Sequence, residues 1–333
     1  MKGLKFWLVL MGMALLASVF AAGQEMVFQY SFPTEAMLAQ DVYLKYGSGL
    51  ACDRAGNVWV VDAGEGVIQQ FDPAGRFLKK VGRPGQGPGE FSRPGAIHVT
   101  EDGDLLVLDF GNVRLAVLSG QGEYKRNIKL TRRYEDFCEF KGKIYLVFNG
   151  PREDGKIVDV LSLAGEPLGS YGDAPDLGPV APYNIRIPYF KVISCDPKGR
   201  LLVGWNFFSM VHILDVGRKG ATATIEIGDP RLKERSRKNR GELNKEKGLI
   251  SWVVPRIRAH RDGFLALVPA ERIEFLDCDM TGKVRATYWA PSPGEDYLGR
   301  DFICRRDGRT TWIYILQTRP ESKVNVYKIK AIS

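Results

Sequence analysis

Residues 51–62 read ACDRAGNVWVVD, and five later segments of the chain repeat the plan of this stretch. Each copy contains a few apolar residues, a small residue, a polar corner ending in glycine, and a second apolar strand. The corner glycines are Gly56, Gly103, Gly142, Gly199, Gly263 and Gly308. The pattern is typical of a β-hairpin whose turn needs a positive φ, which a Cβ atom disfavours.

The spacing of the copies predicts an all-β, six-bladed β-propeller. Successive corner glycines are 47, 39, 57, 64 and 45 residues apart, close to the length of one four-stranded antiparallel blade. A strand-like segment, Met26–Phe32, precedes the first copy, and the sixth copy ends soon after Ile329. We expect residues 22–333 to form a single domain, with the N-terminal strand closing the ring as the outermost strand of the last blade.

The N-terminus, residues 1–21, has the composition of a secretory signal peptide. Lys2 and Lys5 precede an uncharged apolar run from Phe6 to Phe20, and Ala21 supplies a small residue at the cleavage position. The run is short for a membrane span, although an uncleaved anchor is the alternative. We expect an exported protein, periplasmic or extracellular, without a transmembrane span after cleavage.

The charge of the chain limits the classes of partner. Removing Lys2 and Lys5 lowers the formal net charge from +8 to +6, which draws acidic partners weakly. This balance is far from that of a nucleic-acid-binding protein, which would need basic residues clustered on one face.

One region of the sequence resembles an NHL repeat, most closely over residues 50–130. The matching residues are Gly87-Pro88-Gly89-Glu90-Phe91, Pro94, Asp102-Gly103, Val107-Leu108-Asp109 and Asn112-Val113-Arg114. The resemblance implies a propeller that serves as a partner-binding platform, a sensor domain or, less often, an enzyme. We expect Asp62, Asp109, Asn112 and Arg114 to tie turns and neighbouring blades together rather than to act as acids or bases.

Four of the five cysteines stand four residues before a corner glycine. They are Cys52, Cys138, Cys195 and Cys304, and Val99 and Ala259 fill the same place in the second and fifth copies. A position that accepts cysteine, valine or alanine suggests a small buried side chain. We expect reduced thiols rather than disulfides, because equivalent sites in neighbouring blades should lie too far apart. Cys278 is expected in an exposed turn, free or forming an intermolecular bridge.

The three histidines limit the options for catalysis. Lyases with related repeats hold zinc with histidines on inner strands, and in this chain His98 and His260 fall on inner strands, whereas His212 falls on a third strand. Because they stand at different repeat positions, we favour packed or surface histidines and no cofactor. The alternative is a divalent metal such as zinc or calcium held with His98 and His260.

Arginine and aromatic residues collect in the loops of one predicted face of the ring. Connections between blades and between second and third strands share this face, and both residue types dominate binding hot spots. The candidates are Arg83, Arg93, Arg132, Arg133, Tyr134, Tyr183, Arg186, Trp205, Phe207, Phe208, Trp252, Arg256, Arg272 and Arg300.

Two long connections stand out from the repeats. Residues 173–191 are rich in proline and suited to covering the channel mouth. Residues 229–250, between the fourth and fifth blades, predict a short, fully polar helix from Pro230 that forms a solvated flap or, less favoured, contacts a partner.

The leading hypothesis is a non-catalytic, monomeric recognition module that binds an acidic protein or carbohydrate outside the cytoplasm. The alternative is a metal-dependent lyase or hydrolase with its site at the central channel. The first predicts binding that weakens with salt; the second predicts bound metal and activity that depends on His98 or His260.

Overall fold

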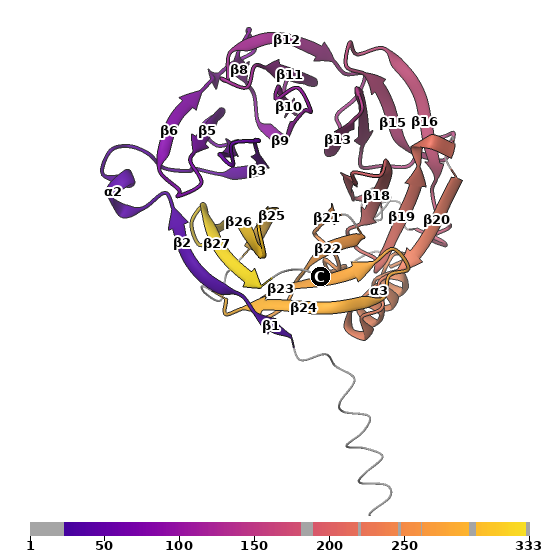
Figure 1. Ribbon diagram of the computed structural model, residues 1–333. Helices are drawn as coiled ribbons and strands as arrows, with labels where there is room; N and C mark the ends of the chain where they lie inside the picture. The colour runs from indigo at the N-terminus through magenta and orange to yellow at the C-terminus, as the bar shows by residue number, and fades with distance from the viewer. Residues whose placement is uncertain are drawn as a thin grey trace, which may run out of the picture.

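Six antiparallel sheets surround a central axis in the computed structural model (Figure 1). The structure describes residues 23–180, 189–218, 221–245, 248–260, 262–292 and 298–330. The predicted signal peptide, residues 1–21, lies outside them. The six-bladed propeller predicted from the repeats is confirmed.

The strands of each blade follow one another from the inner to the outer edge. Blade 1 contains β3 (Gly47–Cys52), β4 (Val58–Asp62), β5 (Val67–Phe71) and β6 (Phe77–Val81). Blade 2 contains β9 (Pro94–Val99), β10 (Leu105–Asp109), β11 (Arg114–Leu118) and β12 (Tyr124–Lys129). Blade 3 contains β13 (Asp136–Phe140), β14 (Lys143–Val147), β15 (Lys156–Ser162) and β16 (Pro167–Asp173).

The second half of the ring follows the same order. Blade 4 contains β17 (Lys191–Cys195), β18 (Arg200–Trp205), β19 (Met210–Asp215) and β20 (Ala221–Glu226). Blade 5 contains β21 (Arg256–His260), β22 (Gly263–Val268), β23 (Ile273–Asp279) and β24 (Val284–Ala290). Blade 6 contains β25 (Leu298–Asp307), β26 (Thr310–Arg319), β27 (Lys323–Lys330) and β2 (Val27–Phe32). The connections carry α2 (Glu35–Leu38), β7 (Arg83–Pro84), β8 (Glu90–Phe91), η3 (Val216–Arg218) and α3 (Pro230–Glu242).

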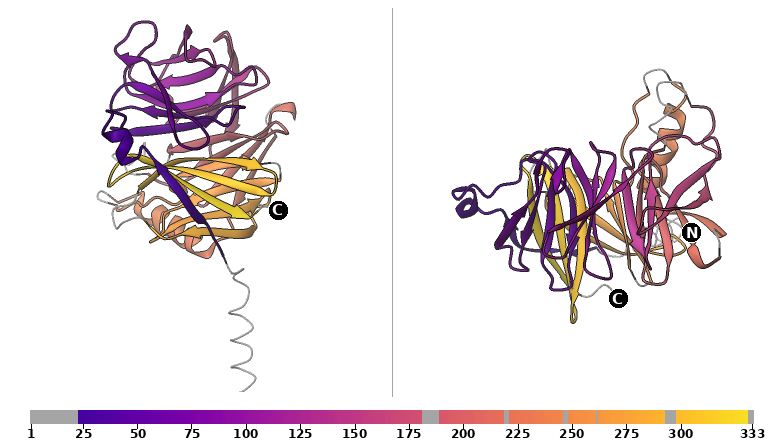
Figure 2. Two further views of the ribbon diagram at one scale, coloured as in Figure 1. Left: turned by 60° about the vertical axis from the view of Figure 1, so that its left-hand side comes forward. Right: turned by 90° about the horizontal axis from the view of Figure 1, so that it is seen from above.

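The N-terminal strand closes the ring as predicted. Strand β2 pairs antiparallel with β27, and Ser31 lies opposite Asn325. The chain before it adds a contact that the sequence did not indicate, because β1 (Gln24–Glu25) pairs in parallel with β24 as a fifth strand of blade 5. The N-terminal segment therefore holds two blades, as the indigo ribbon beside the orange and yellow strands shows in Figure 2.

The hydrophobic core lies between neighbouring blades. At the junction of blades 6 and 1, Phe32 and Phe71 are fully buried with ring centroids 4.5 Å apart, and Leu50 and Ile303 pack with them. Alternate residues of each strand face opposite neighbours, so each blade is covered on both sides by apolar side chains.

Five of the six corner glycines have the predicted positive φ, from +58° at Gly308 to +86° at Gly103. The exception is Gly263, which lies inside β22 and outside the left-handed region. A Cβ atom there would lie 2.0 Å from the carbonyl oxygen of Cys278, so close backbone approach is the reason for glycine. The exposed position expected for Cys278 is wrong: β23 extends to Asp279 and the side chain is fully buried.

The expectation that the four equivalent cysteines are reduced is also wrong for two of them. Cys138 of blade 3 and Cys195 of blade 4 form a disulfide with their Cα atoms 5.9 Å apart. Inner strands of neighbouring blades converge near the axis, so equivalent positions come within bridging distance. Cys52, Cys278 and Cys304 are free thiols.

Cys304 stands four residues before its corner glycine, as Cys52, Cys138 and Cys195 do, but its side chain points in a different direction. Asp301 accepts a hydrogen bond from the Leu50 amide of blade 1 at 3.0 Å, and Ile303 packs against the same blade. Because side chains alternate along a strand, Cys304 faces the other way, where the charge of Arg258 from blade 5 acts on its thiol. The free thiol of blade 6 is thus turned away from blade 1.

Helix α3 rises above one face of the ring (Figure 2, right). Its start at Pro230 was predicted, and Asp229 caps it by accepting from the amides of Arg231 and Leu232. The solvated flap is wrong, because Leu232 and Asn239 are buried and Asn239 Nδ2 donates to the Phe207 carbonyl at 2.8 Å. Within the described ranges, no helix is long and apolar enough to cross a membrane.

Candidate functional site

The NHL-like residues of blade 2 build a rigid loop between β10 and β11. Buried Asp109 accepts hydrogen bonds from the Ser92 amide (2.8 Å), Asn112 Nδ2 (2.6 Å) and Arg114 Nε (3.0 Å). Arg114 also donates to three carbonyls of the connection from blade 1, including that of Glu90 at 2.7 Å. The structural role predicted for these side chains is confirmed.

This loop presents Phe110 to two arginines. The guanidinium carbons of Arg93 and Arg133 each lie 5.6 Å from the centroid of the Phe110 ring. Beside them, Arg132 lies 4.7 Å from the centroid of Phe148. We call these five residues the arginine platform. They come from the loops that join blades 1 to 2 and 2 to 3, and from loops that follow second strands.

Backbone strain supports a functional role for the platform. Arg93 has a φ of +56°, and Val113, in the loop that carries Phe110, has a φ of +52°. Residues other than glycine rarely adopt this region, and a β-branched residue least of all. Such strain clusters at ligand-binding sites, where the surrounding structure holds it in place.

The platform arginines are exposed, and no carboxylate of the described chain pairs with them. Arginines elsewhere have such partners: Arg83 pairs with Glu90, and Arg272 with Glu274. Arg300, also exposed, likewise has no ion pair with a described residue. The described arginines of the predicted face therefore divide into those that form ion pairs within the chain and four that do not. Of these four, Arg300 still acts on the Glu135 carboxyl, where its charge opposes the rise in pKa caused by burial.

Arg256 does not belong to the surface as predicted. It is 7 % exposed and bridges two inner strands, with Nη1 2.5 Å from Asp136 Oδ2 and Nε 3.0 Å from Asp301 Oδ1. Burial lowers the pKa of Arg256, but the two carboxylates outweigh it and hold the pKa above its ordinary value. Because Asp136 also accepts from the Ile193 amide, this cluster fastens the inner strands of blades 3, 4, 5 and 6.

Several aromatic candidates are also structural. Tyr134 is buried and donates to Asp159 at 2.7 Å, and Trp205 is fully buried with its Nε1 donating to His212 Nδ1 at 2.9 Å. Phe207 and Phe208 are buried, whereas Trp252 is 41 % exposed. Tyr183 and Arg186 lie outside the described residues. Sequence reasoning missed Phe110 and Phe148, although both stand in loops of the predicted ligand face.

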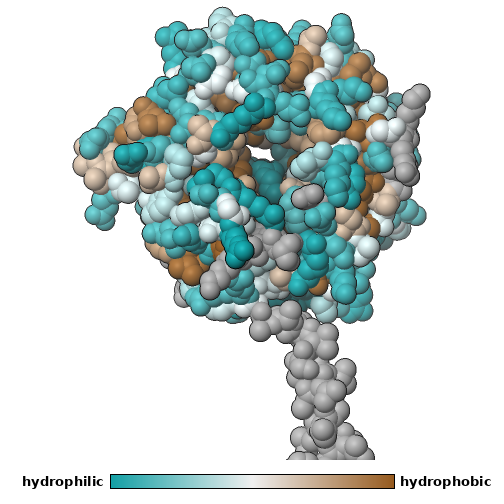
Figure 3. All heavy atoms as spheres, viewed as in Figure 1, coloured by the Kyte–Doolittle hydropathy of each residue, from teal (hydrophilic) through white to brown (hydrophobic). Residues whose placement is uncertain are grey.

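The central channel contains a cavity of about 300 Å³. Its lining includes His98, Ser194, Arg258, Cys304 and the Cys138–Cys195 disulfide. The space-filling view shows an opening at the centre of the ring with hydrophilic residues inside (Figure 3). The inner strands thus enclose a polar space.

The histidines do not come together. His98 of blade 2 has its Nε2 3.9 Å from Glu139, whereas His260 of blade 5 has its Nε2 3.1 Å from Asp277. Burial, with the charge of Arg258, lowers the pKa of His98 to about 4, so the ring is neutral at physiological pH. A metal shared by His98 and His260 does not fit, and the described residues contain no group of three or more metal-ligating side chains.

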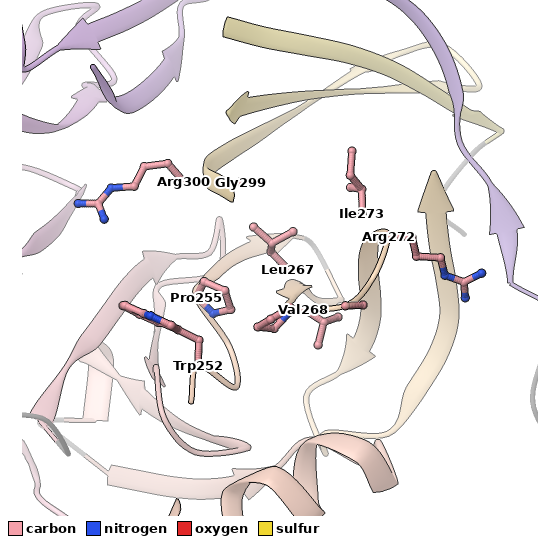
Figure 4. Close-up of a pocket in the computed structure, with 10 residues that line it drawn as sticks. Trp252, Pro255, Leu267, Val268, Arg272, Ile273, Gly299 and Arg300 are labelled. Atoms are coloured by element: carbon pink, nitrogen blue, oxygen red, sulfur yellow. The ribbon is translucent and has the colours of Figure 1, made fainter. Parts of the chain in front are cut away.

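A second pocket lies over blades 5 and 6, with a volume of about 210 Å³ (Figure 4). Apolar residues, including Leu267, Val268 and Ile273, line it, with Trp252 and Arg300 at one side. We call it the Trp252 pocket. Of the predicted face residues, it brings together Trp252, Arg272 and Arg300.

Comparison with known proteins supports the fold. A family model described as a 6-bladed beta-propeller matches residues 48–156. Human E3 ubiquitin-protein ligase TRIM32 is 45% identical over 49 residues, which are 15% of this chain and 8% of that protein. This short match suggests an NHL-type repeat, and no property of the rest of the human protein is transferred to this chain.

Solved structures give the same architecture at low identity. Virginiamycin B lyase from Staphylococcus aureus is 13% identical, with a TM-score of 0.54, over 86% of this chain and 98% of the lyase. A Bacteroides fragilis protein whose name describes it as exported is 7% identical, with a TM-score of 0.59, over 92% and 94% of the two chains. A DUF4221 family member from Bacteroides vulgatus is 15% identical, with a TM-score of 0.57, over 93% and 99%. These likenesses show the six-bladed fold alone.

Proposed function

We propose that the protein is a non-catalytic recognition module that binds an acidic partner outside the cytoplasm through the arginine platform. The observation that carries this proposal is the set of exposed guanidinium groups, Arg93, Arg132 and Arg133, held against aromatic rings without a carboxylate partner in the described chain.

Contact with the rings of Phe110 and Phe148 orients these guanidinium groups in the unbound protein. A guanidinium that lies on a ring has lost part of its side-chain freedom, so less entropy is lost when it pairs with an anion. Arg93 and Arg133 share one ring, so their like charges repel, and an anionic group placed between them relieves that repulsion. Bidentate hydrogen bonding to carboxylates makes acidic protein or carbohydrate the partner class that fits.

A test compares two variants that lose the same charge from opposite faces. The platform variant carries Arg93→Gln, Arg132→Gln and Arg133→Gln; the control carries Arg54→Gln, Lys143→Gln and Arg309→Gln, at exposed sites near the β-hairpins. Immobilised polyglutamate and polygalacturonate serve as protein-like and carbohydrate probes. We expect the native protein to bind one of them, with an affinity that falls between about 50 and about 300 mM salt.

The platform variant should lose at least about tenfold in affinity for that probe, while the control keeps most of it. Equal losses in both variants would mean that only net charge matters, and no binding by the native protein would reject the acidic-partner class. The lyase or hydrolase alternative rests on His98, which faces the channel cavity, and on the similarity to virginiamycin B lyase. Stoichiometric metal in the purified protein, lost in His98→Gln, would favour that alternative.

A further inference from the structure

The walls of the Trp252 pocket are fixed by helix α3. Arg235 Nη1 donates to the carbonyl oxygens of Trp252 and Pro269, each at 3.1 Å, and so clamps two loops that line the pocket. The indole of Trp252 is held by Phe207, whose ring centroid is 4.9 Å away, and by Phe190 at 6.3 Å. An indole that is 41 % exposed yet packed on one side forms a prepared wall.

The size of the pocket selects a compact apolar group. Its volume of about 210 Å³ is somewhat larger than an apolar cavity of roughly 150 Å³ that accepts benzene. The interior is formed by Leu267, Val268 and Ile273, none more than 5 % exposed. A single aromatic or branched aliphatic group therefore fits, and a hydrophilic ligand gains nothing from these walls.

Two arginines stand at the rim of the Trp252 pocket, and only one of them forms an ion pair within the described chain. Arg272 has its Nε 3.1 Å from Glu274 and its guanidinium 4.7 Å from the centroid of Trp289, so its charge is already compensated. Arg300 has no ion pair with a described residue. Figure 4 shows the two arginines extending to opposite sides of the apolar residues, with Arg300 on the side of Trp252. An anionic group at this rim would meet one guanidinium that makes no ion pair with a described residue. The charge of Arg300 also acts on the Glu135 carboxyl, where it opposes the rise in pKa that burial causes.

We propose that the Trp252 pocket is a binding site for a small apolar carboxylate, with its hydrocarbon group against Leu267, Ile273 and Trp252 and its carboxylate paired with Arg300. The site lies over blades 5 and 6 and uses none of the platform residues, so it stands or falls independently of the proposed function.

Calorimetric titration of the mature chain, residues 22–333, tests the proposal with three probes. Phenylpropanoate has both the ring and the charge, phenylpropanamide has only the ring, and propanoate has only the charge. We expect phenylpropanoate to bind once per chain, the amide to bind at least about tenfold more weakly, and propanoate not to saturate.

Variants separate the two parts of the site. Arg300→Gln should weaken phenylpropanoate to the level of the amide and leave the amide unchanged, whereas Trp252→Ala should weaken both probes. Arg309→Gln, an exposed arginine on the opposite hairpin of blade 6, is the matched control and should change neither. Because Arg300 is exposed, its variant stays informative even if Trp252→Ala fails to fold.

Three results would overturn the proposal. The first is no saturable binding of phenylpropanoate by the native protein up to about 10 mM. The second is equal affinity for the acid and the amide. The third is an Arg300→Gln variant that binds the acid as tightly as Arg309→Gln does.

Discussion

Lys191 has an amine enclosed by aromatic rings. Its Nζ lies 5.1 Å from the centroid of Trp205, 5.5 Å from that of Phe148 and 5.7 Å from that of Tyr189, and it donates to the Tyr189 carbonyl at 2.7 Å. The residue is 3 % exposed. Burial lowers its pKa to about 7, against the opposing effect of the negative charge of Glu135.

This pKa predicts a dependence of stability on pH. Between about pH 7 and pH 10 the unfolded chain keeps the Lys191 proton while the folded chain has lost it, so the free energy of unfolding rises with pH. The contribution is up to about 1.4 kcal/mol per pH unit in that window. Lys191→Met should remove this part of the slope and make the protein more stable at pH 6 than the native chain is.

Urea unfolding at pH 6, 7.5 and 9 measures the effect. Lys143→Met, at an exposed position of β14, is the control and should keep the native slope. A Lys191→Met variant whose slope matches that of the control would show that the amine titrates as it does in the unfolded chain.

Among the elements, the inner strands of blades 3 and 4 are joined by a disulfide, whereas those of blades 6 and 1 are not. Cys52 in blade 1 is equivalent to Cys195 in blade 4. Each is the last paired residue of its inner strand, and each stands four residues before its corner glycine. Opposite Cys52 stands Ile303 rather than a cysteine, and the two pack together in the core between blades 6 and 1. The chain thus offers its own comparison between a bridged and an unbridged junction.

Replacing both Cys138 and Cys195 by alanine should destabilise the protein by about 4 kcal/mol, the loop-closure effect of a bridge across 57 residues. Cys52→Ala should cost less, because it removes only a partly buried side chain. Chemical unfolding with and without reductant measures both. If reductant leaves the native protein as stable as before, the bridge does not contribute.

For the whole molecule, closure of the ring depends on a segment far from its partner in the sequence. Strand β2 covers the edge of β27, and Phe32 is fully buried between blades 6 and 1. Without β2, the last blade would have three strands and an open hydrophobic edge.

Deleting residues 24–34 should therefore abolish cooperative unfolding or make the protein aggregate. Deleting residues 331–333, which follow β27, should leave the unfolding transition unchanged. Circular dichroism melting and gel filtration distinguish these outcomes. A deletion lacking β2 that still melted cooperatively as a monomer at the native temperature would show that three strands suffice in blade 6.

The number of blades, the ring closure and five of the six glycine turns could be predicted from the repeat pattern alone. These features are local: a turn glycine, an apolar strand and a repeat length can each be read along the chain. The pattern also located the face that carries Arg93, Arg132, Arg133 and Arg300, because that face follows from loop order. The residues that tie the loops together, Asp109 among them, were identified from the repeat itself.

Which of these side chains remain free depends on contacts between blades. Arg256 looked like the other arginines in sequence, but carboxylates from blades 3 and 6 enclose it. Cys195 has a partner and Cys304 does not, because strand register determines which neighbouring blade each side chain faces. Such contacts join residues that lie far apart in the chain at no regular spacing, so the repeat pattern does not indicate them. The ion pairs, the disulfide, the burial of individual side chains and the Trp252 pocket therefore follow from the packing of the blades.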